Sequence, residues 1–337
     1  MKNFGIYMML AALSLCASQS VAQTYSVTDL GTLNGNTISQ GTALNNAGEA
    51  VGDSYDPGAT TGVMFSGGTL KSIVGTPTAI NASGEIAGYF TPNGATQFNA
   101  YLYSNGRTTD LNSKSLFPAG SQASGINNSG EVVGTGYLNS STFHAFVYSG
   151  GKMTDLGPPG AFQANAYAIN TSGQIVGTYA LNSGVSGTFL YTNGTMTALP
   201  VPNSSSVGYG YAINDSGEIA GFLFIDSGQY HAAKFSNGSW TDLGVLTGSL
   251  QNEAKAINAS GQIVGTSVFP STYKPFKAGK HVPFISTAGG LVNLNTLIPS
   301  GTGFTLTDAV AINAAGEILC DATNAGGNEH AVLLSPK

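Results

Sequence analysis

One short segment recurs along this chain, and its recurrence limits the possible fold more than any other feature. The copy at residues 167–179 reads YAINTSGQIVGTY. The other copies are ALNNAGEAVG (43–52), AINASGEIAG (79–88), GINNSGEVVG (125–134), AINDSGEIAG (212–221), AINASGQIVG (256–265) and AINAAGEILC (311–320). The shared glycines lie 36 to 55 residues apart. Such a period is typical of solenoids, propellers and other repeat arrays.

Each copy predicts the tight turn of a β-hairpin. The first turn residue is Asn, whose side chain can accept a hydrogen bond from the backbone two residues on, and the fourth is Gly, which tolerates left-handed backbone. Small, β-branched and aromatic flanks favour strands. We interpret these pairs as structural turn residues, in preference to a functional Asn at every turn. They are Asn45 and Gly48, Asn81 and Gly84, Asn127 and Gly130, Asn170 and Gly173, Asn214 and Gly217, Asn258 and Gly261, and Asn313 and Gly316.

A second hairpin follows most copies. Its first strand reads NAYLY (99–103), HAFVY (144–148), GTFLY (187–191), HAAKF (231–235) or HVPFI (281–285), and its second strand often ends in Asp-Leu. One unit is therefore four short antiparallel strands, which is the size of a propeller blade.

The two ends of the repeat array complement each other. Residues 25–33 read as a fourth strand without its first three, and residues 329–335 as a third strand without a fourth. Joining them completes a unit and removes the exposed sheet edges of an open stack. The sequence thus predicts an all-β, seven-bladed β-propeller of four-stranded antiparallel blades. We expect a single domain over residues 23–337, closed by pairing the N-terminal strand with the C-terminal strands.

The pattern HAFVY, TDLG, AINTSGQIVG resembles the HAF-type extracellular repeat, a family of bacterial secreted proteins. The resemblance covers nearly the whole chain after residue 22, although only residues 144–146 read His-Ala-Phe literally and the strand at 61–66 lacks His. It implies a repeat fold and export, and it assigns no catalytic residues.

Residues 1–22 are predicted to be a signal peptide. Lys2 precedes an apolar run, and Ser20 and Ala22 form a small-x-small cleavage motif. A retained membrane anchor is the alternative, but the apolar run is short for a membrane span. We expect a secreted or periplasmic monomer with no membrane span in the mature chain.

Composition and residue placement argue against several classes of partner. Only 8% of residues are charged and the net charge is −6, which disfavours nucleic acid. The four histidines begin equivalent strands of different units and should stay too far apart to share an ion, so no metal or cofactor is expected. They are His144, His231, His281 and His330. Cys320 stands where other copies have Gly, which predicts a small buried residue rather than a nucleophile.

One connection departs from the uncharged repeat. Residues 267–280 read SVFPSTYKPFKAGK. Tyr273 and Phe276 could stack against sugar rings, and Lys274, Lys277 and Lys280 could attract acidic groups. We take these five as candidate binding residues and expect salt-sensitive binding to an acidic polymer or protein. The alternative is a long loop whose aromatic side chains fold back on their own blade.

No residues are predicted to be catalytic. Most carboxylates belong to the repeat, and replacement of its Glu by Gln174 and Gln262 suggests solvent-facing turn positions. Asp215, Glu253 and Asp308 lie outside the repeat pattern on different units, without a recognisable pairing. The sequence therefore favours a non-catalytic binding scaffold for an extracellular glycan or a secreted or surface protein. The alternatives are a polysaccharide lyase or glycosidase and a structural component of the cell surface.

Overall fold

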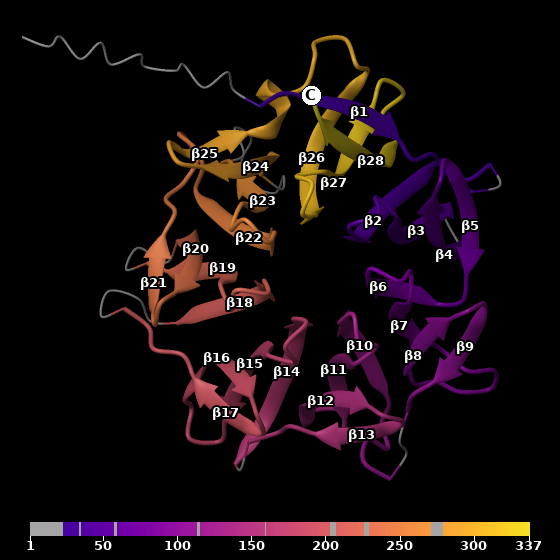
Figure 1. Ribbon diagram of the computed structural model, residues 1–337, viewed down its shortest axis with the longest axis vertical. Helices are drawn as coiled ribbons and strands as arrows, with labels where there is room; N and C mark the ends of the chain where they lie inside the picture. The colour runs from indigo at the N-terminus through magenta and orange to yellow at the C-terminus, as the bar shows by residue number, and fades with distance from the viewer. Residues whose placement is uncertain are drawn as a thin grey trace, which may run out of the picture.

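The chain forms a ring of small antiparallel sheets around a central axis (Figure 1). The computed structural model describes residues 23–33, 35–56, 59–112, 115–158, 160–202, 207–225, 229–270 and 279–337. The predicted signal peptide lies outside these residues. Each unit places its first strand nearest the axis and its fourth strand at the rim (Figure 1).

The strands fall into four positions. First, inner strands are β2 (Ile38–Leu44), β6 (Thr76–Ile80), β10 (Ser121–Ile126), β14 (Ala161–Ile169), β18 (Gly208–Ile213), β22 (Gln251–Ile257) and β26 (Phe304–Ile312). Second strands are β3 (Ala50–Asp56), β7 (Ile86–Phe90), β11 (Val132–Tyr137), β15 (Ile175–Leu181), β19 (Ile219–Phe224), β23 (Ile263–Val268) and β27 (Ile318–Asn324). Third strands are β4 (Ala59–Ser66), β8 (Asn99–Ser104), β12 (Phe143–Ser149), β16 (Ser186–Thr192), β20 (Tyr230–Ser236), β24 (His281–Thr287) and β28 (Glu329–Pro336). Fourth strands are β5 (Thr69–Ile73), β9 (Arg107–Asp110), β13 (Lys152–Asp155), β17 (Thr195–Ala198), β21 (Ser239–Asp242), β25 (Gly290–Asn293) and β1 (Tyr25–Asp29), and a 3₁₀ turn, η1 (Leu294–Thr296), follows β25.

This arrangement is an all-β propeller with four-stranded antiparallel blades, as predicted, but its sheets are not seven separate ones. In the described part of the chain, five sheets have four strands and one has eight. The eight-stranded sheet arises because Phe143 of β12 and Gln163 of β14 form a parallel pair. That contact joins the antiparallel strands β10–β13 to the antiparallel strands β14–β17.

The two ends of the described chain meet in one sheet, ordered β1-β28-β27-β26. Strand β1 pairs with β28 in antiparallel register from Tyr25 opposite Pro336 to Asp29 opposite Val332. The backbone N–H of Lys337 also donates to the Thr24 carbonyl at 2.9 Å. Strands from opposite ends therefore close the ring, which is the pairing expected from the complementary ends.

Hydrophobic cores lie between neighbouring units and not at the axis. Phe146, Phe189 and Phe284 of the third strands are fully buried, and each packs against a neighbouring unit. Glycine in the second strands allows the first strand to approach closely. A Cβ on Gly177, for example, would stand 2.0 Å from the Asn165 carbonyl oxygen.

Cys320 occupies this glycine position in β27 and is buried, as predicted. Its partner strand β26 carries an additional register shift between Leu306 and Asp308, directly beside the Ala309–Cys320 pair. Burial raises the pKa of the Cys320 thiol well above its ordinary value, so the thiol stays protonated and unreactive at neutral pH.

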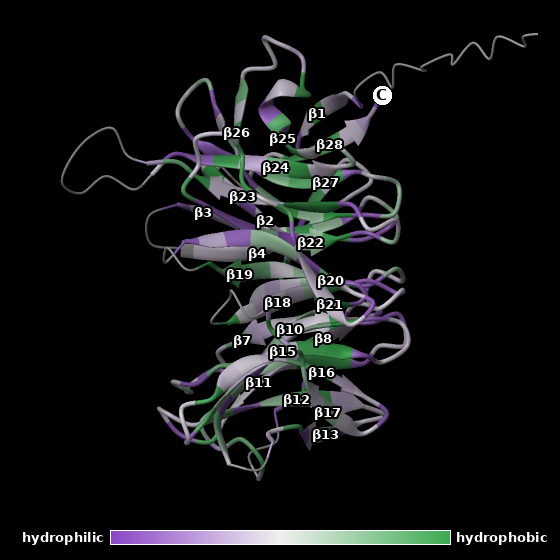
Figure 2. Cartoon of the chain, turned by 90° about the vertical axis from the view of Figure 1, so that its left-hand side faces the viewer, coloured by the Kyte–Doolittle hydropathy of each residue, from purple (hydrophilic) through white to green (hydrophobic). Residues whose placement is uncertain are grey.

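The strand order gives the ring two different faces. The turns between first and second strands and between third and fourth strands lie on one face. The connections between second and third strands and those between units lie on the other. Seen from the side, the apolar strands lie inside and the polar loops at the two faces (Figure 2). Among the described residues, no helix is long and apolar enough to cross a membrane.

Candidate binding site

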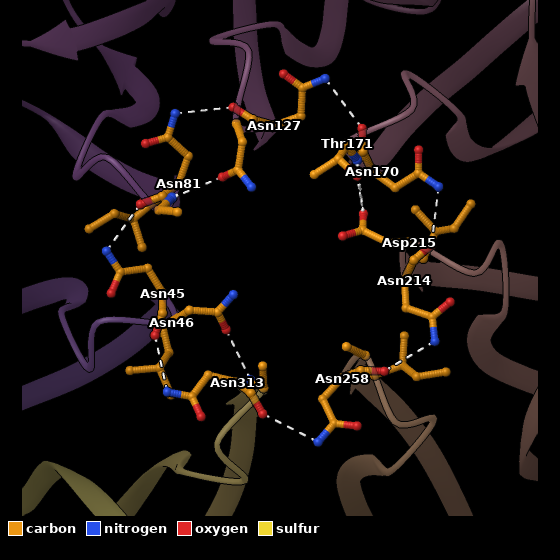
Figure 3. Close-up of a pocket in the computed structure, with 18 of the residues that line it drawn as sticks. Asn45, Asn46, Asn81, Asn127, Asn170, Thr171, Asn214, Asp215, Asn258 and Asn313 are labelled. Atoms are coloured by element: carbon orange, nitrogen blue, oxygen red, sulfur yellow. Dashed lines mark hydrogen bonds between the residues drawn. The ribbon is translucent and has the colours of Figure 1, made fainter.

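The recurrent asparagines form a closed ring around the axis (Figure 3). Each Asn Nδ2 donates to the backbone carbonyl of the equivalent Asn in the next unit, at 3.0 to 3.2 Å. The series runs from Asn45 to Asn81, Asn127, Asn170, Asn214, Asn258 and Asn313, and Asn313 then donates to the carbonyl of Asn45. The asparagine thus links units to each other as well as shaping its own turn.

Each ring asparagine uses its whole side chain. In the first turn, Oδ1 of Asn45 accepts the N–H groups of Ala47 and Glu49 at 3.0 and 2.9 Å. Its Nδ2 donates to Glu49 Oε2 at 2.8 Å as well as to the next unit. The turn glycines adopt positive φ, for example 77° at Gly48. The side chain is 4% exposed, so its polar atoms are paired within the protein rather than offered to a ligand.

The acidic residue of the repeat is not simply solvent-facing, which corrects the sequence interpretation. Glu49 is half-buried, and its second oxygen accepts from the Ser66 hydroxyl at the end of the third strand, at 2.7 Å. Ser104 and Ser149 bind Glu85 and Glu131 in the same way. In one unit Lys234, two residues before the equivalent serine on the third strand, pairs with Glu218 at 2.9 Å and lowers the pKa of that carboxyl. These contacts tie the first hairpin to the second.

A cavity of ≈ 200 Å³ lies inside the asparagine ring. Its outer edge is formed by the residues that follow each ring asparagine. Three of these also bridge units: Asn46, Asn128 and Asp215 accept backbone N–H groups of the preceding unit, at 2.9 to 3.0 Å. Because the polar groups around this cavity are largely satisfied by one another, the ring is best explained as a structural closure.

The inner strands differ from one another at a second equivalent position. Each carries a register shift that leaves one residue out of the pairing. In three units this residue has a small hydroxyl group that bonds backbone carbonyls of its own unit and the next. Thr42, for example, donates to Val51 and Pro77, and Thr78 and Ser124 make the corresponding bonds. In β14, β18 and β22 the residue is instead Tyr167, Tyr211 or Lys255.

Charged groups gather beside these replacements. Lys255 of β22 forms an ion pair with Asp308 of β26 at 2.5 Å, and the Thr266 hydroxyl donates to the same carboxylate. Burial raises the pKa of Glu253, and the neighbouring Asp308 raises it further, against the opposing effects of Lys255 and a hydrogen bond from Tyr211. Asp308 is therefore paired with a lysine of the preceding unit, a contact not identified from the sequence.

Two further carboxyls extend this group toward the closing sheet. Burial raises the pKa of Asp321 to about 7, although the Gly41 N–H donates to it at 2.8 Å. Glu329 accepts from the Gln40 side chain at 3.1 Å, across the junction between the last and first units. We call Glu253, Lys255, Asp308, Asp321 and Glu329 the acid–lysine cluster.

An aromatic cluster adjoins it on the two preceding units. It consists of Tyr167, Tyr209, Tyr211, Phe222, Phe224 and Tyr230. Ring centroids are 5.1 Å apart for Tyr167 and Tyr211 and 5.0 Å apart for Phe222 and Tyr230. Tyr209 is near the start of β18 and Phe224 at the end of β19. This cluster therefore lies toward the face opposite the asparagine ring. Together the two clusters form what we call the acid–aromatic surface.

The predicted binding loop is only partly described. Tyr273, Lys274, Phe276 and Lys277 lie outside the described residues. Lys280 is exposed, and its carbonyl accepts from the Phe269 N–H at 2.9 Å, which brings the two ends of the connection together. Since this connection joins a second to a third strand, it leaves from the same face as the acid–aromatic surface.

Three histidines pair with the Asp that ends the fourth strand of their own unit. His144 contacts Asp155 and His231 contacts Asp242, both at 2.9 Å. His330 and Asp29 make the same pair at 3.0 Å across the junction of the two chain ends. Each Asp also accepts a backbone N–H two residues on. In the described part of the chain, no three His, Cys, Asp or Glu residues are grouped so that they could hold a metal ion.

Solved structures share this fold at low sequence identity. The β-propeller domain of the trilobed protease from Pyrococcus furiosus is 8% identical, with a TM-score of 0.57 over 90% of this chain and 95% of that one. An acylaminoacyl peptidase from Pyrococcus horikoshii is 12% identical, with a TM-score of 0.55 over 89% of this chain and 52% of that one. A puromycin-hydrolyzing peptidase from Mycobacterium tuberculosis is 10% identical, with a TM-score of 0.52 over 85% of this chain and 50% of that one.

The chain thus spans about half the length of each of these two peptidases. No protein-family model and no curated protein matches the sequence. Identities this low show a common fold and carry no activity to this chain.

Proposed function

We propose that this protein is an exported, non-catalytic β-propeller that binds a glycan or a surface protein at the acid–aromatic surface. Export rests on the signal-peptide pattern of residues 1–22 and on the resemblance to the HAF-type repeat family. The rigid ring supports the scaffold role, because the repeat residues are engaged in linking strands and units to each other.

We count the propeller as seven-bladed in this proposal. The asparagine ring supports this number, since it has one member per unit and closes from Asn313 to Asn45. Within the eight-stranded sheet, β12 and β14 are joined by a single parallel pair. We therefore treat β10–β13 and β14–β17 as two blades in contact.

The observation that carries the binding role is the break in the repeat on consecutive inner strands. Where three units use Thr or Ser to bond backbone groups, the next three carry Tyr167, Tyr211 and Lys255. The small hydroxyl residue is sufficient to link units in three cases, so large aromatic and charged residues are not required at this position for the fold. Aromatic faces and half-buried carboxyls are groups that bind sugars and peptides in concave protein sites.

The test replaces the departing residue with the one that the repeat itself uses. Tyr211→Thr should fold, because Thr42 and Thr78 occupy the equivalent position. The purified protein is titrated with soluble neutral, acidic and amine-bearing polysaccharides by calorimetry. Phe98→Thr is the matched control, as Phe98 is 46% exposed on a different unit. We expect binding to at least one polymer that Tyr211→Thr weakens and Phe98→Thr leaves unchanged. Absence of binding to all polymers, or equal binding by both variants, would contradict a glycan site here.

A glycosidase or lyase is the second candidate, and the carboxyl pair favours it. Glu253 has a raised pKa and lies beside Asp308, which is paired with a lysine ammonium. Two carboxyls in unlike environments can serve as acid and base. Release of reducing ends or unsaturated products from the same polysaccharides, abolished by Glu253→Gln, would support catalysis. Undegraded polymer with intact binding would exclude it for that polymer.

Salt-sensitive binding of an acidic polymer by the 267–280 connection stays a separate prediction. It is tested by replacing Lys274, Lys277 and Lys280 with Ser. If the triple variant is retained on acidic polymer as well as the wild type is, this connection is not the binding element.

A further inference from the structure

The acid–aromatic surface combines two kinds of contact that few ligands can use together. Tyr211 connects the two clusters, since its ring centroid lies 5.1 Å from that of Tyr167 and its hydroxyl is close enough to Glu253 to lower the pKa of that carboxyl. Glu253 also raises the pKa of Tyr230, which lies on the third strand of the preceding unit, the unit that contains Tyr211. An aromatic face therefore lies directly beside a carboxyl group.

The charge of this surface is unbalanced. Three half-buried carboxyl groups, Glu253, Asp308 and Glu329, accompany one ammonium group, and Lys255 is already engaged by Asp308 at 2.5 Å. Within the described residues, Glu253 forms no ion pair, and the Tyr211 hydroxyl lies close enough to lower the pKa of its carboxyl. Glu253 is thus a half-buried acceptor with no cationic hydrogen-bond partner, next to aromatic rings that themselves attract cations.

We infer that the ligand is an oligosaccharide bearing free amino groups, with sugar rings against the tyrosines and an ammonium group hydrogen-bonded to Glu253. This inference rests on the proposed binding function and names its ligand class. The apolar faces of hexose rings suit aromatic side chains, and the ammonium group supplies the charge that the surface lacks. An acidic sugar would instead face Glu253, Asp308 and Glu329. A neutral sugar would leave the Glu253 carboxyl without charge complement.

Proton release should accompany binding. Burial and the neighbouring Asp308 keep the pKa of Glu253 above its ordinary value, against Lys255 and Tyr211. An ammonium group beside the carboxyl would favour its ionised form. Binding of an amine should therefore release a proton from the fraction of molecules in which Glu253 is protonated. Calorimetry in buffers of different ionisation enthalpy measures this release.

The experiment compares two ligands that differ only in the amino group. Glucosamine oligomers and N-acetylglucosamine oligomers of equal length are titrated into wild type, Glu253→Gln, Tyr211→Thr and the Phe98→Thr control. We expect the wild type to bind the amine form more tightly by about tenfold or more, the scale of a charged hydrogen bond. Glu253→Gln should remove this preference and the proton release, Tyr211→Thr should weaken both ligands, and Phe98→Thr should change neither.

Each result separates this inference from the function on which it rests. Equal binding of the two oligomers, weakened by Tyr211→Thr, would overturn the amine preference and leave the glycan-binding site standing. Binding only to another polysaccharide of the panel would also overturn the amine preference and leave the glycan-binding site standing. Absence of binding to every saccharide would overturn both. Because the comparison of the two ligands uses wild-type protein, it decides the matter even if a variant fails to fold.

Discussion

The ring asparagine has no spare hydrogen-bonding capacity, so its replacement should be costly even by its closest relative. Its Oδ1 accepts two backbone N–H groups of its own turn. Its Nδ2 donates one hydrogen bond to a backbone carbonyl of the neighbouring unit and one to the side chain of the fourth residue after it. Aspartate keeps the acceptors but loses both donors. The further loss of stability depends on whether the residue four positions after the asparagine is Glu or Gln.

Asn127→Asp and Asn170→Asp should therefore differ. Asn127 faces a carboxylate, with Nδ2 at 2.7 Å from Glu131, whereas Asn170 faces the amide of Gln174 at 2.7 Å. The first variant places two carboxylates in contact, while Gln174 can rotate its amide and donate. We expect a loss of roughly 3 kcal/mol for Asn127→Asp and roughly 1–2 kcal/mol for Asn170→Asp. The measurement is urea unfolding at pH 7, and equal losses would show that the donor to Glu131 is unimportant.

Asp321 should make stability depend on pH. Burial raises its pKa from 3.8 to about 7, with Asp308 and Glu329 adding to the shift and the Gly41 N–H and Lys255 opposing it. The folded state holds this proton more tightly than the unfolded state does. The resulting contribution of Asp321 to the free energy of unfolding is therefore fully present below about pH 4. It is lost as the pH rises through about 7.

Asp321→Asn removes this dependence and keeps an acceptor for the Gly41 N–H. At pH 4 we expect the variant and the wild type to unfold with similar free energies. At pH 8 the variant should be more stable by on the order of 4 kcal/mol, at about 1.4 kcal/mol per unit of pKa shift. Denaturant unfolding at the two pH values measures this difference. A variant less stable than the wild type at pH 8 would mean that the ionised carboxylate is held favourably.

At the scale of the strand and turn, the repeated segment determines its own conformation. Turn chemistry and strand-forming flanks act between residues close in sequence, so the hairpins and four-stranded units could be predicted from Asn, Gly and their neighbours. The contacts between units could not be predicted in this way. Lys255 and Asp308 are 53 residues apart in sequence, and their meeting depends on how neighbouring inner strands face each other. The hydrogen bonds of the asparagine ring could not be predicted for the same reason, although the asparagines were identified as turn residues.

The turn glycine offers a test at this scale. Gly173 has φ of 75°, where a Cβ is unfavourable even though the nearest atom, Glu131 Oε2, is 3.6 Å away. Gly173→Ala should lower the free energy of unfolding by about 1–2 kcal/mol through backbone strain alone. Gly289→Ala is the matched control, because Gly289 lies in a hairpin turn without positive φ and with Thr287 Oγ1 at 3.7 Å as its nearest neighbour. Thermal unfolding compares the two, and equal effects would contradict the conformational explanation.

At the scale of the whole molecule, the closing sheet draws its strands from both ends of the described chain. Strand β28 pairs with β27 on one side and with β1 on the other. Opening this sheet therefore requires both ends to separate, whereas a sheet made from one continuous segment could detach as a unit. The asparagine ring adds a second closure on the axis, through the bond from Asn313 to Asn45. Ring stability should consequently depend on where the chain is cut.

Two circular permutants of residues 23–337 isolate this effect. In both, a short glycine linker joins residue 337 to residue 23, whose neighbour Thr24 is already bonded to Lys337 at 2.9 Å. One permutant opens between Asn105 and Gly106, so β9 begins the chain and β8 ends it, recreating a shared sheet in another unit. The other opens beside Val74, which is 51% exposed between β5 and β6, so every sheet is continuous at the new ends. We expect the first to melt near the wild type and the second roughly 5 °C lower, about 2 kcal/mol for a chain of this size. Equal melting temperatures for the two permutants would show that the strand shared between the ends does not stabilise the ring.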